Sequence, residues 1–215
     1  MVTDVLPFAV GIAVSPFPII PVILLLFTRR ALATSSSFLA GWVIGIVTAT
    51  TVFVLLAEVL EDRDYTPTWA SWARIVLGIA LVVLGVLEWL NRRAKDEPPA
   101  WMQSIEAATP RRALRLGFLL SAANPKILLL AAAAGLAIGA ETASPVAVVG
   151  SVVLFTVVAA STVAVPVLLY SILGDRILPP LGTAKNWMQE NNAAVMAVFL
   201  AVIGLLLLAK GISDL

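Results

Sequence analysis

The chain has 215 residues, of which 60% are hydrophobic and 13% are charged, about half the charged share of an average soluble domain. The net charge is +1, so nothing points to a nucleic-acid partner, and we expect none. Cysteine and histidine are absent, which excludes disulfides, thiol redox chemistry and the commonest metal ligands. We therefore expect an integral membrane protein without a metal or another cofactor.

Six segments approach or exceed the roughly 20 apolar residues that cross a hydrocarbon core. The segments are residues 5–27, 36–60, 70–90, 116–140, 145–173 and 193–209. The N-terminal "MVTDVLPFAV" has no basic region before its apolar stretch, so we expect a first span rather than a removed leader. The expected fold class is an all-α integral membrane protein with six transmembrane helices.

Basic residues predict the orientation of these spans. The connections after the first, third and fifth spans carry ten Lys or Arg residues, and the opposite side carries three. Because cytoplasmic loops are rich in Lys and Arg, we expect both termini outside a bacterial plasma membrane. The longest connection, residues 91–115, then lies in the cytoplasm. It is either a short helix on the inner leaflet or a solvated linker, and the sequence favours neither.

Proline interrupts the first and fourth spans at corresponding positions. Ser15-Pro16 precedes "FPIIPVILLLF", and Asn124-Pro125 precedes "KILLLAAAAG". Matched breaks in the two halves of a membrane protein are typical of transporters built from inverted repeats, with the substrate site at the breaks. We predict two inverted three-helix repeats, residues 1–90 and 116–215, joined by the connection 91–115. For either proline alone, the simpler interpretation is a packing kink.

Paired glycines recur in both halves. "GWVIG" contains Gly41 and Gly45, and "GLAIG" contains Gly135 and Gly139, so each pair lies on one face of a helix. Small residues at this spacing let membrane helices approach closely. We expect these glycines to serve packing alone.

Lys126 is the residue that the sequence singles out. It lies about ten residues into the fourth span, where a basic side chain costs roughly 2.5–3.5 kcal/mol. Glu58 and Glu88 lie near the ends of their spans, so we expect no carboxylate at the depth of Lys126. The lysine is then neutral, held by carbonyls freed at the breaks, or exposed to a cavity that receives an anion.

Other residues at similar depth complete the expected substrate site. They are Asn124, Pro125, Ser15, Pro16, Pro18, Thr48, Thr51, Ser161 and Thr162. The alternative role of the hydroxyls is to bond the backbone of their own helix.

Three stretches, "SPFPIIPVILLL", "SFLAGWVIG" and "NPK", resemble in this order the lysine-exporter superfamily. Within it, the chain is most similar to the glycolipid-addressing proteins of mycobacteria and their actinobacterial relatives. The resemblance implies a plasma-membrane exporter with two inverted repeats that moves envelope lipids or their precursors outward. It also places the family's proline elements on Ser15, Pro16 and Pro18, and on Asn124, Pro125 and Lys126.

We therefore expect a transporter or flippase for an amphipathic, anionic envelope lipid or glycolipid. Two alternatives remain open: an exporter of a small solute such as an amino acid or ion, and a non-transporting scaffold of an envelope-lipid export machine. The sequence holds no catalytic constellation, so we do not expect an enzyme. The expected partners are membrane lipids, the lipid or small-molecule substrate, and either further copies of the chain or export machinery.

Overall fold

The computed structural model describes residues 2–61, 68–90, 108–140 and 144–213, and these residues form helices joined by short turns. The helices are α1 (Val2–Val14), α2 (Pro16–Leu26), α3 (Ala31–Glu61), α4 (Thr68–Leu90), α6 (Pro110–Ala122), α7 (Pro125–Gly139), α8 (Pro145–Leu173), the 3-10 helix η2 (Gly174–Ile177) and α9 (Leu178–Ser213). No strand occurs in these four ranges, which confirms the predicted all-α class.

Four stretches of these helices are long and apolar enough to cross a membrane by themselves. They are Ala31–Ala57, Ser71–Leu90, Pro145–Trp187 and Ala194–Ser213. Two further pairs, α1 with α2 and α6 with α7, are each bent at a short break, by 47° and 63°. The described chain therefore has four spans, or six if each bent pair is counted as one.

Two boundaries differ from the sequence prediction. The fourth segment becomes helical at Pro110 rather than at residue 116, because the Thr109 side chain accepts a hydrogen bond from the Arg112 backbone N–H and caps the helix. The loop expected before the last span is mostly helix, since α9 begins at Leu178. Pro179 and Pro180 fit there because the first turn of a helix needs no internal N–H donors. The connection 91–115, considered either as an inner-leaflet helix or as a linker, lies mostly outside the described residues.

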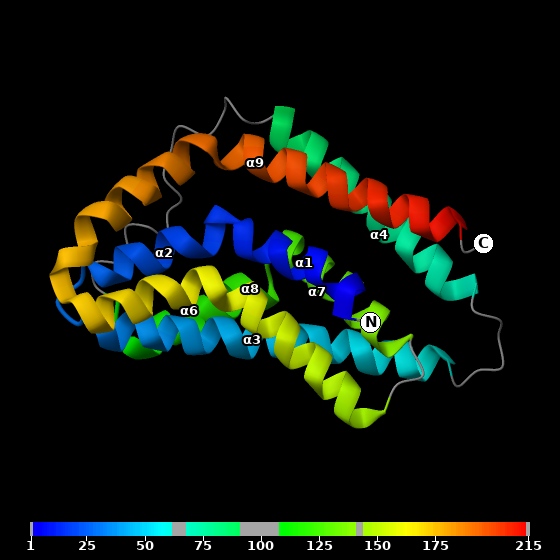
Figure 1. Cartoon of the computed structure of the whole chain (residues 1–215), viewed down its shortest axis with the longest axis horizontal. Coiled ribbons are helices and arrows are strands. Elements are labelled where there is room, and N and C mark those ends of the chain that lie inside the picture. The colour runs from blue at the N-terminus through cyan, green and yellow to red at the C-terminus, as the bar shows by residue number, and fades with distance from the viewer. Residues whose placement is uncertain (1, 62–67, 91–107, 141–143, 214–215) are drawn as a thin grey trace.

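The helices form two flanks, with two further helices between them (Figure 1). Helices α4 and α9 pack side by side along one flank, while α3, α6 and α8 form the opposite flank. Between them run α1 and α7, which contact each other in opposite directions. Both chain ends lie at the same end of the molecule, as an even number of crossings requires.

Glycines bring the helices into close contact. A Cβ atom on Gly117 of α6 would lie 2.9 Å from the backbone nitrogen of Trp42 in α3, and one on Gly135 of α7 would lie 2.6 Å from the Thr50 carbonyl oxygen. Both are closer than side chains are found in proteins, so only glycine fits without a shift. The packing role predicted for the paired glycines is confirmed: Gly41 and Gly45 meet α6, whereas Gly135 and Gly139 meet α3.

Helices α4 and α9 are joined in the same way. Gly78 and Gly85 of α4 face the backbone of α9, while Gly204 and Gly211 of α9 face the backbone of α4. A Cβ on either Gly78 or Gly204 would lie 2.8 Å from the carbonyl oxygen of the other. Helices α4 and α9 therefore form a closely packed pair.

Candidate functional site

The two predicted breaks are present at the predicted residues. Helix α1 ends at Val14 and α2 begins at Pro16, and Ser15 between them is extended, with φ −62° and ψ 121°. Asn124 is extended in the same way before Pro125, with φ −75° and ψ 120°. The cause is local, because a proline ring disfavours the helical conformation of the residue before it.

The restarted helices are capped differently. Asn124 accepts a hydrogen bond through Oδ1 from the Lys126 backbone N–H, at 3.0 Å, and so caps α7. Ser15 is buried but makes no such capping bond to α2. The start of α7 is therefore the better ordered of the two restarts, and it places Lys126 in the first turn of the helix.

The two breaks lie at about the same level of the bundle. A Cβ on Gly11 would lie 3.2 Å from Leu130 Cδ1, which fixes the register of α1 against α7. Ser15 lies four residues after Gly11, and Lys126 lies four residues before Leu130. Since α1 and α7 run in opposite directions (Figure 1), these two offsets lead to the same level of the bundle. The first and fourth spans therefore contact each other through α1 and α7.

Lys126 forms an ion pair with Glu88 of α4, where its Nζ donates a hydrogen bond to the Glu88 carboxylate. The side chains of Lys126 and Glu88 retain 26% and 9% of their exposure. The expectation that no carboxylate reaches the depth of Lys126 is therefore wrong. Neither a lone neutral lysine nor a lysine held only by carbonyls describes this site.

The path of α4 explains why the sequence misplaced Glu88. Along the chain, Glu88 lies two residues before the end of α4, a position that predicts a place at the membrane edge. In the structure, α4 and α9 run obliquely across the bundle (Figure 1), so the last turn of α4 reaches the level of the α6–α7 break. The available signal was the carboxylate itself, since an acidic residue within an apolar span calls for a partner.

The start of α7 is an environment suited to a negative charge. Backbone N–H groups in the first turn of a helix carry a partial positive charge, and Lys126 adds a full one there. Glu88 already brings a carboxylate to this point. The arrangement can therefore hold one anionic group between α4 and α7.

The remaining site candidates are divided in the structure. On α3, Thr48 is exposed and Thr51 is half-buried. Pro18 is buried in α2, and the side chain of Pro16 lies outside the described part of the structure. Ser161 donates its hydroxyl to the Val158 carbonyl at 2.7 Å, which is the backbone role considered for such residues. The structure therefore places Ser15, Asn124, Pro125 and Lys126 at the breaks, whereas Thr48 and Thr51 lie within α3, and Ser161 and Thr162 lie within α8.

Three buried polar groups have no hydrogen-bond partner among the described residues. They are Trp42 Nε1, Thr50 Oγ1 and Thr162 Oγ1. Only Thr162 belonged to the site expected from the sequence. Groups of this kind cost free energy when buried.

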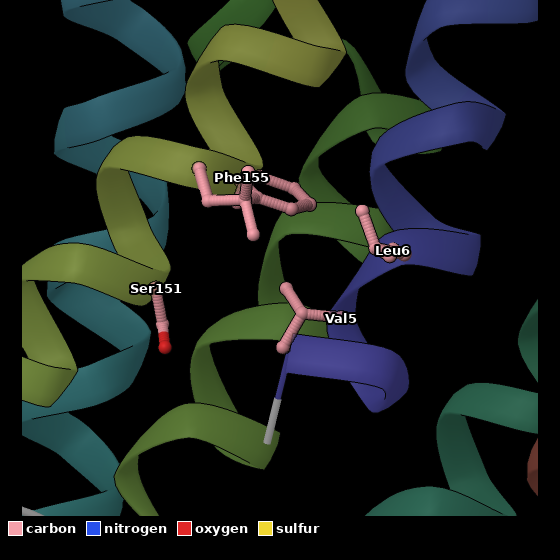
Figure 2. A pocket seen from close by; sticks show the side chains of 5 residues that line it. Val5, Leu6, Ser151 and Phe155 are labelled. Atoms are coloured by element: carbon pink, nitrogen blue, oxygen red, sulfur yellow. The ribbon is translucent and has the colours of Figure 1, made fainter.

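A small apolar pocket lies between α1 and α8 (Figure 2). It is a shallow hollow lined by Val5, Leu6, Ser151, Leu154 and Phe155. Figure 2 shows the side chains of Val5 and Leu6 facing those of α8. None of the candidate residues at the breaks lines this pocket, so it is separate from the Lys126–Glu88 pair. Within the described ranges, no group of three Asp or Glu residues is placed to hold a metal ion.

Comparison with protein families gives one match, over nearly the whole chain. The family model described as Sap, sulfolipid-1-addressing protein, matches residues 5–213. This match confirms the resemblance to addressing proteins, whereas membership of the wider lysine-exporter superfamily stays a prediction. No curated protein and no solved structure matches the chain.

Proposed function

The chain belongs to the sulfolipid-1-addressing protein family, and we propose from this premise that it exports an anionic, amphipathic envelope lipid across a bacterial plasma membrane. The observation that carries the proposal is the Lys126–Glu88 pair, which places a cation at the break of a membrane helix in a chain of this family. A sulfolipid has an anionic headgroup, and Lys126 supplies the complementary charge.

The neighbours of each helix support the proposed inverted repeat. If α1–α2, α3 and α4 correspond to α6–α7, α8 and α9, then contacts should occur in exchanged pairs. Helix α3 contacts both parts of the broken α6–α7 element, and α8 contacts both parts of the broken α1–α2 element. Likewise α9 contacts α2, and α4 contacts α7. This reciprocity is what a pseudo-two-fold axis produces, and repeats with an odd number of spans would place that axis in the membrane plane.

The charge distribution supports an orientation with both termini outside. The turn after α2, the start of α6 and the 3-10 helix η2 carry exposed basic residues at one end of the molecule. They are Arg29, Arg30, Arg111, Arg112 and Arg176. By the positive-inside rule this end faces the cytoplasm, so a lipid made there would be taken up near the basic end and released at the end that holds the termini.

Reconstitution of the full chain into liposomes tests the proposal. Transfer of fluorescent phosphatidylglycerol, a model anionic lipid, is followed by the loss of signal when dithionite reduces the probe in the outer leaflet. We expect the wild type to accelerate transfer, and the double variant Glu88→Gln, Lys126→Met to transfer at the protein-free rate. That variant removes both charges together and so avoids a lone buried ion.

The alternatives predict other results. A scaffold of an export machine would leave lipid transfer at the protein-free rate even for the wild type. An exporter of small solutes would move amino acids or ions but not the labelled lipid. Transfer by the double variant at the wild-type rate would disprove a role for the ion pair.

A further inference from the structure

We propose that Glu88 is an internal competitor of the anionic substrate: it occupies Lys126 in the resting protein, and an anionic headgroup displaces it and so releases α4 from α7. This inference rests on the proposed function, because it identifies what the substrate must replace. It extends that function by assigning Glu88 a regulatory role.

The position of the ion pair allows another anion to replace Glu88 as the partner of Lys126. Lys126 retains 26% of its side-chain exposure, so a second anion can approach it without prior unfolding of the site. Glu88 and Lys126 lie on different helices, separated by 38 positions in the chain. A headgroup that brings its own negative charge replaces the Coulomb attraction lost with Glu88, and in a low-dielectric interior this attraction is strong. Lys126 thus keeps a counter-ion throughout the exchange.

The contacts of α4 explain why displacement would loosen the structure. Helix α4 packs along its length against α9 and has a smaller contact with α7, where the ion pair lies. The glycine contacts hold α4 and α9 together independently of that pair. Loss of the ion pair therefore leaves the α4–α9 pair intact and weakens its connection to the rest of the bundle.

A second contact shows where an opening would form. A Cβ on Gly11 of α1 would lie 3.0 Å from Phe199 Cζ, so the Phe199 ring covers the seam between α9 and α1. This seam lies near the breaks, because Gly11 is four residues before Ser15. Movement of the α4–α9 pair would uncover the seam sideways, toward lipid. A lateral path is what a substrate with acyl chains requires, since its tails can stay in the bilayer while the headgroup crosses.

A binding experiment tests the competition directly. The full chain is placed in phosphatidylcholine nanodiscs that contain increasing amounts of pyrene-labelled phosphatidylglycerol, and binding is read from energy transfer between the protein's tryptophans and pyrene. We expect Glu88→Gln to bind this anionic lipid about tenfold more tightly than the wild type, a typical coupling between sites. Pyrene-labelled phosphatidylcholine, the matched neutral control, should bind both proteins equally. The double variant Glu88→Gln, Lys126→Met should lose the preference for the anionic lipid.

A distance measurement on a protein with its ion pair intact gives a second test. Spin labels are attached at Val83 of α4 and Val157 of α8, both exposed, and the reference pair is Val52 of α3 with Val157. The chain has no cysteine, so labels go only where cysteines are introduced. Phosphatidylglycerol should lengthen or broaden the Val83–Val157 distance and leave the reference pair unchanged, and phosphatidylcholine alone should change neither.

The inference is overturned if Glu88→Gln binds phosphatidylglycerol no more tightly than the wild type, or if neither distance responds to this lipid. These failures can be told apart from failure of the proposed function. If the protein transfers lipid, but Glu88 does not compete with phosphatidylglycerol and the α4–α9 pair does not move, then only the regulatory role of Glu88 is disproved. Competition and movement without any lipid transfer keep the role of Glu88 and argue against export.

Discussion

Lys126 and Glu88 depend on each other, and this changes what removal of either should do. If Lys126 had no carboxylate partner, Lys126→Met would only remove a costly buried charge. With the ion pair present, the same change leaves the carboxylate of Glu88, whose side chain is 9% exposed, with one counter-ion fewer. Breaking a buried pair by removing one partner is strongly destabilising, whereas replacing both partners is often neutral.

We therefore expect Lys126→Met to lower the free energy of unfolding by about 2–3 kcal/mol, somewhat less than for a fully buried pair because Lys126 is partly exposed. The double variant Glu88→Gln, Lys126→Met should regain most of that loss. Thermal unfolding of the purified proteins in one detergent measures both. Equal melting temperatures for the single and double variants would mean that the pair does not couple the two residues.

At the scale of elements, the fold depends on helices whose backbones lie close together because a glycine occupies the point of contact. A Cβ on Gly117 would overlap the Phe38 carbonyl oxygen and lie 2.9 Å from the Trp42 backbone nitrogen. These atoms belong to the rigid backbone of α3 and cannot rotate away. Helices α3 and α6 would have to separate, and the ordered packing of the adjacent Phe38 and Trp42 rings, whose centroids lie 6.2 Å apart, would change with them.

Gly117→Ala should destabilise the protein by about 1–3 kcal/mol, the usual cost of overpacking. Gly150→Ala is the matched control, because Gly150 also lies in a helix, is exposed, and has nothing within 4 Å of the added Cβ. That change should be neutral or stabilise by up to about 1 kcal/mol through higher helix propensity. The melting temperatures of the two variants, each compared with the wild type, test this prediction. Similar shifts for both variants would contradict close packing of α3 on α6.

At the scale of the whole molecule, the structure puts both termini at one end, and the charges predict which end faces the cytoplasm. Ser144, before α8, lies near the end with the termini, and Asp175, in η2, lies near the opposite end; both are exposed. A single cysteine at either position reports the side of the membrane that it faces.

A membrane-impermeant maleimide added to intact cells should label Ser144→Cys and should label Asp175→Cys only after permeabilisation. The reason is the excess of Lys and Arg at the end that holds Asp175, which by the positive-inside rule predicts that this end faces the cytoplasm. The reverse pattern would invert the orientation. Labelling of both cysteines from outside would contradict six crossings.

Much of this protein was determined by local sequence. The apolar runs specified helices, Ser15-Pro16 and Asn124-Pro125 specified where two of them break, and "GWVIG" and "GLAIG" specified faces for close packing. Each of these features depends on the backbone and side chains of a few adjacent residues. The same reasoning identified Lys126 as the residue in need of a partner, because an unpaired basic side chain at this depth of an apolar span is costly.

Only the tertiary structure decided which partner Lys126 has. Depth counted along the chain assumes that every span crosses the membrane at the same angle, and under that assumption Glu88 lies at an edge. In the structure, α4 instead packs against α9 along an oblique path, and Glu88 pairs with Lys126 at the break before α7. A contact between residues 38 positions apart leaves no local pattern, since it depends on the packing of two helices against others rather than on either helix alone.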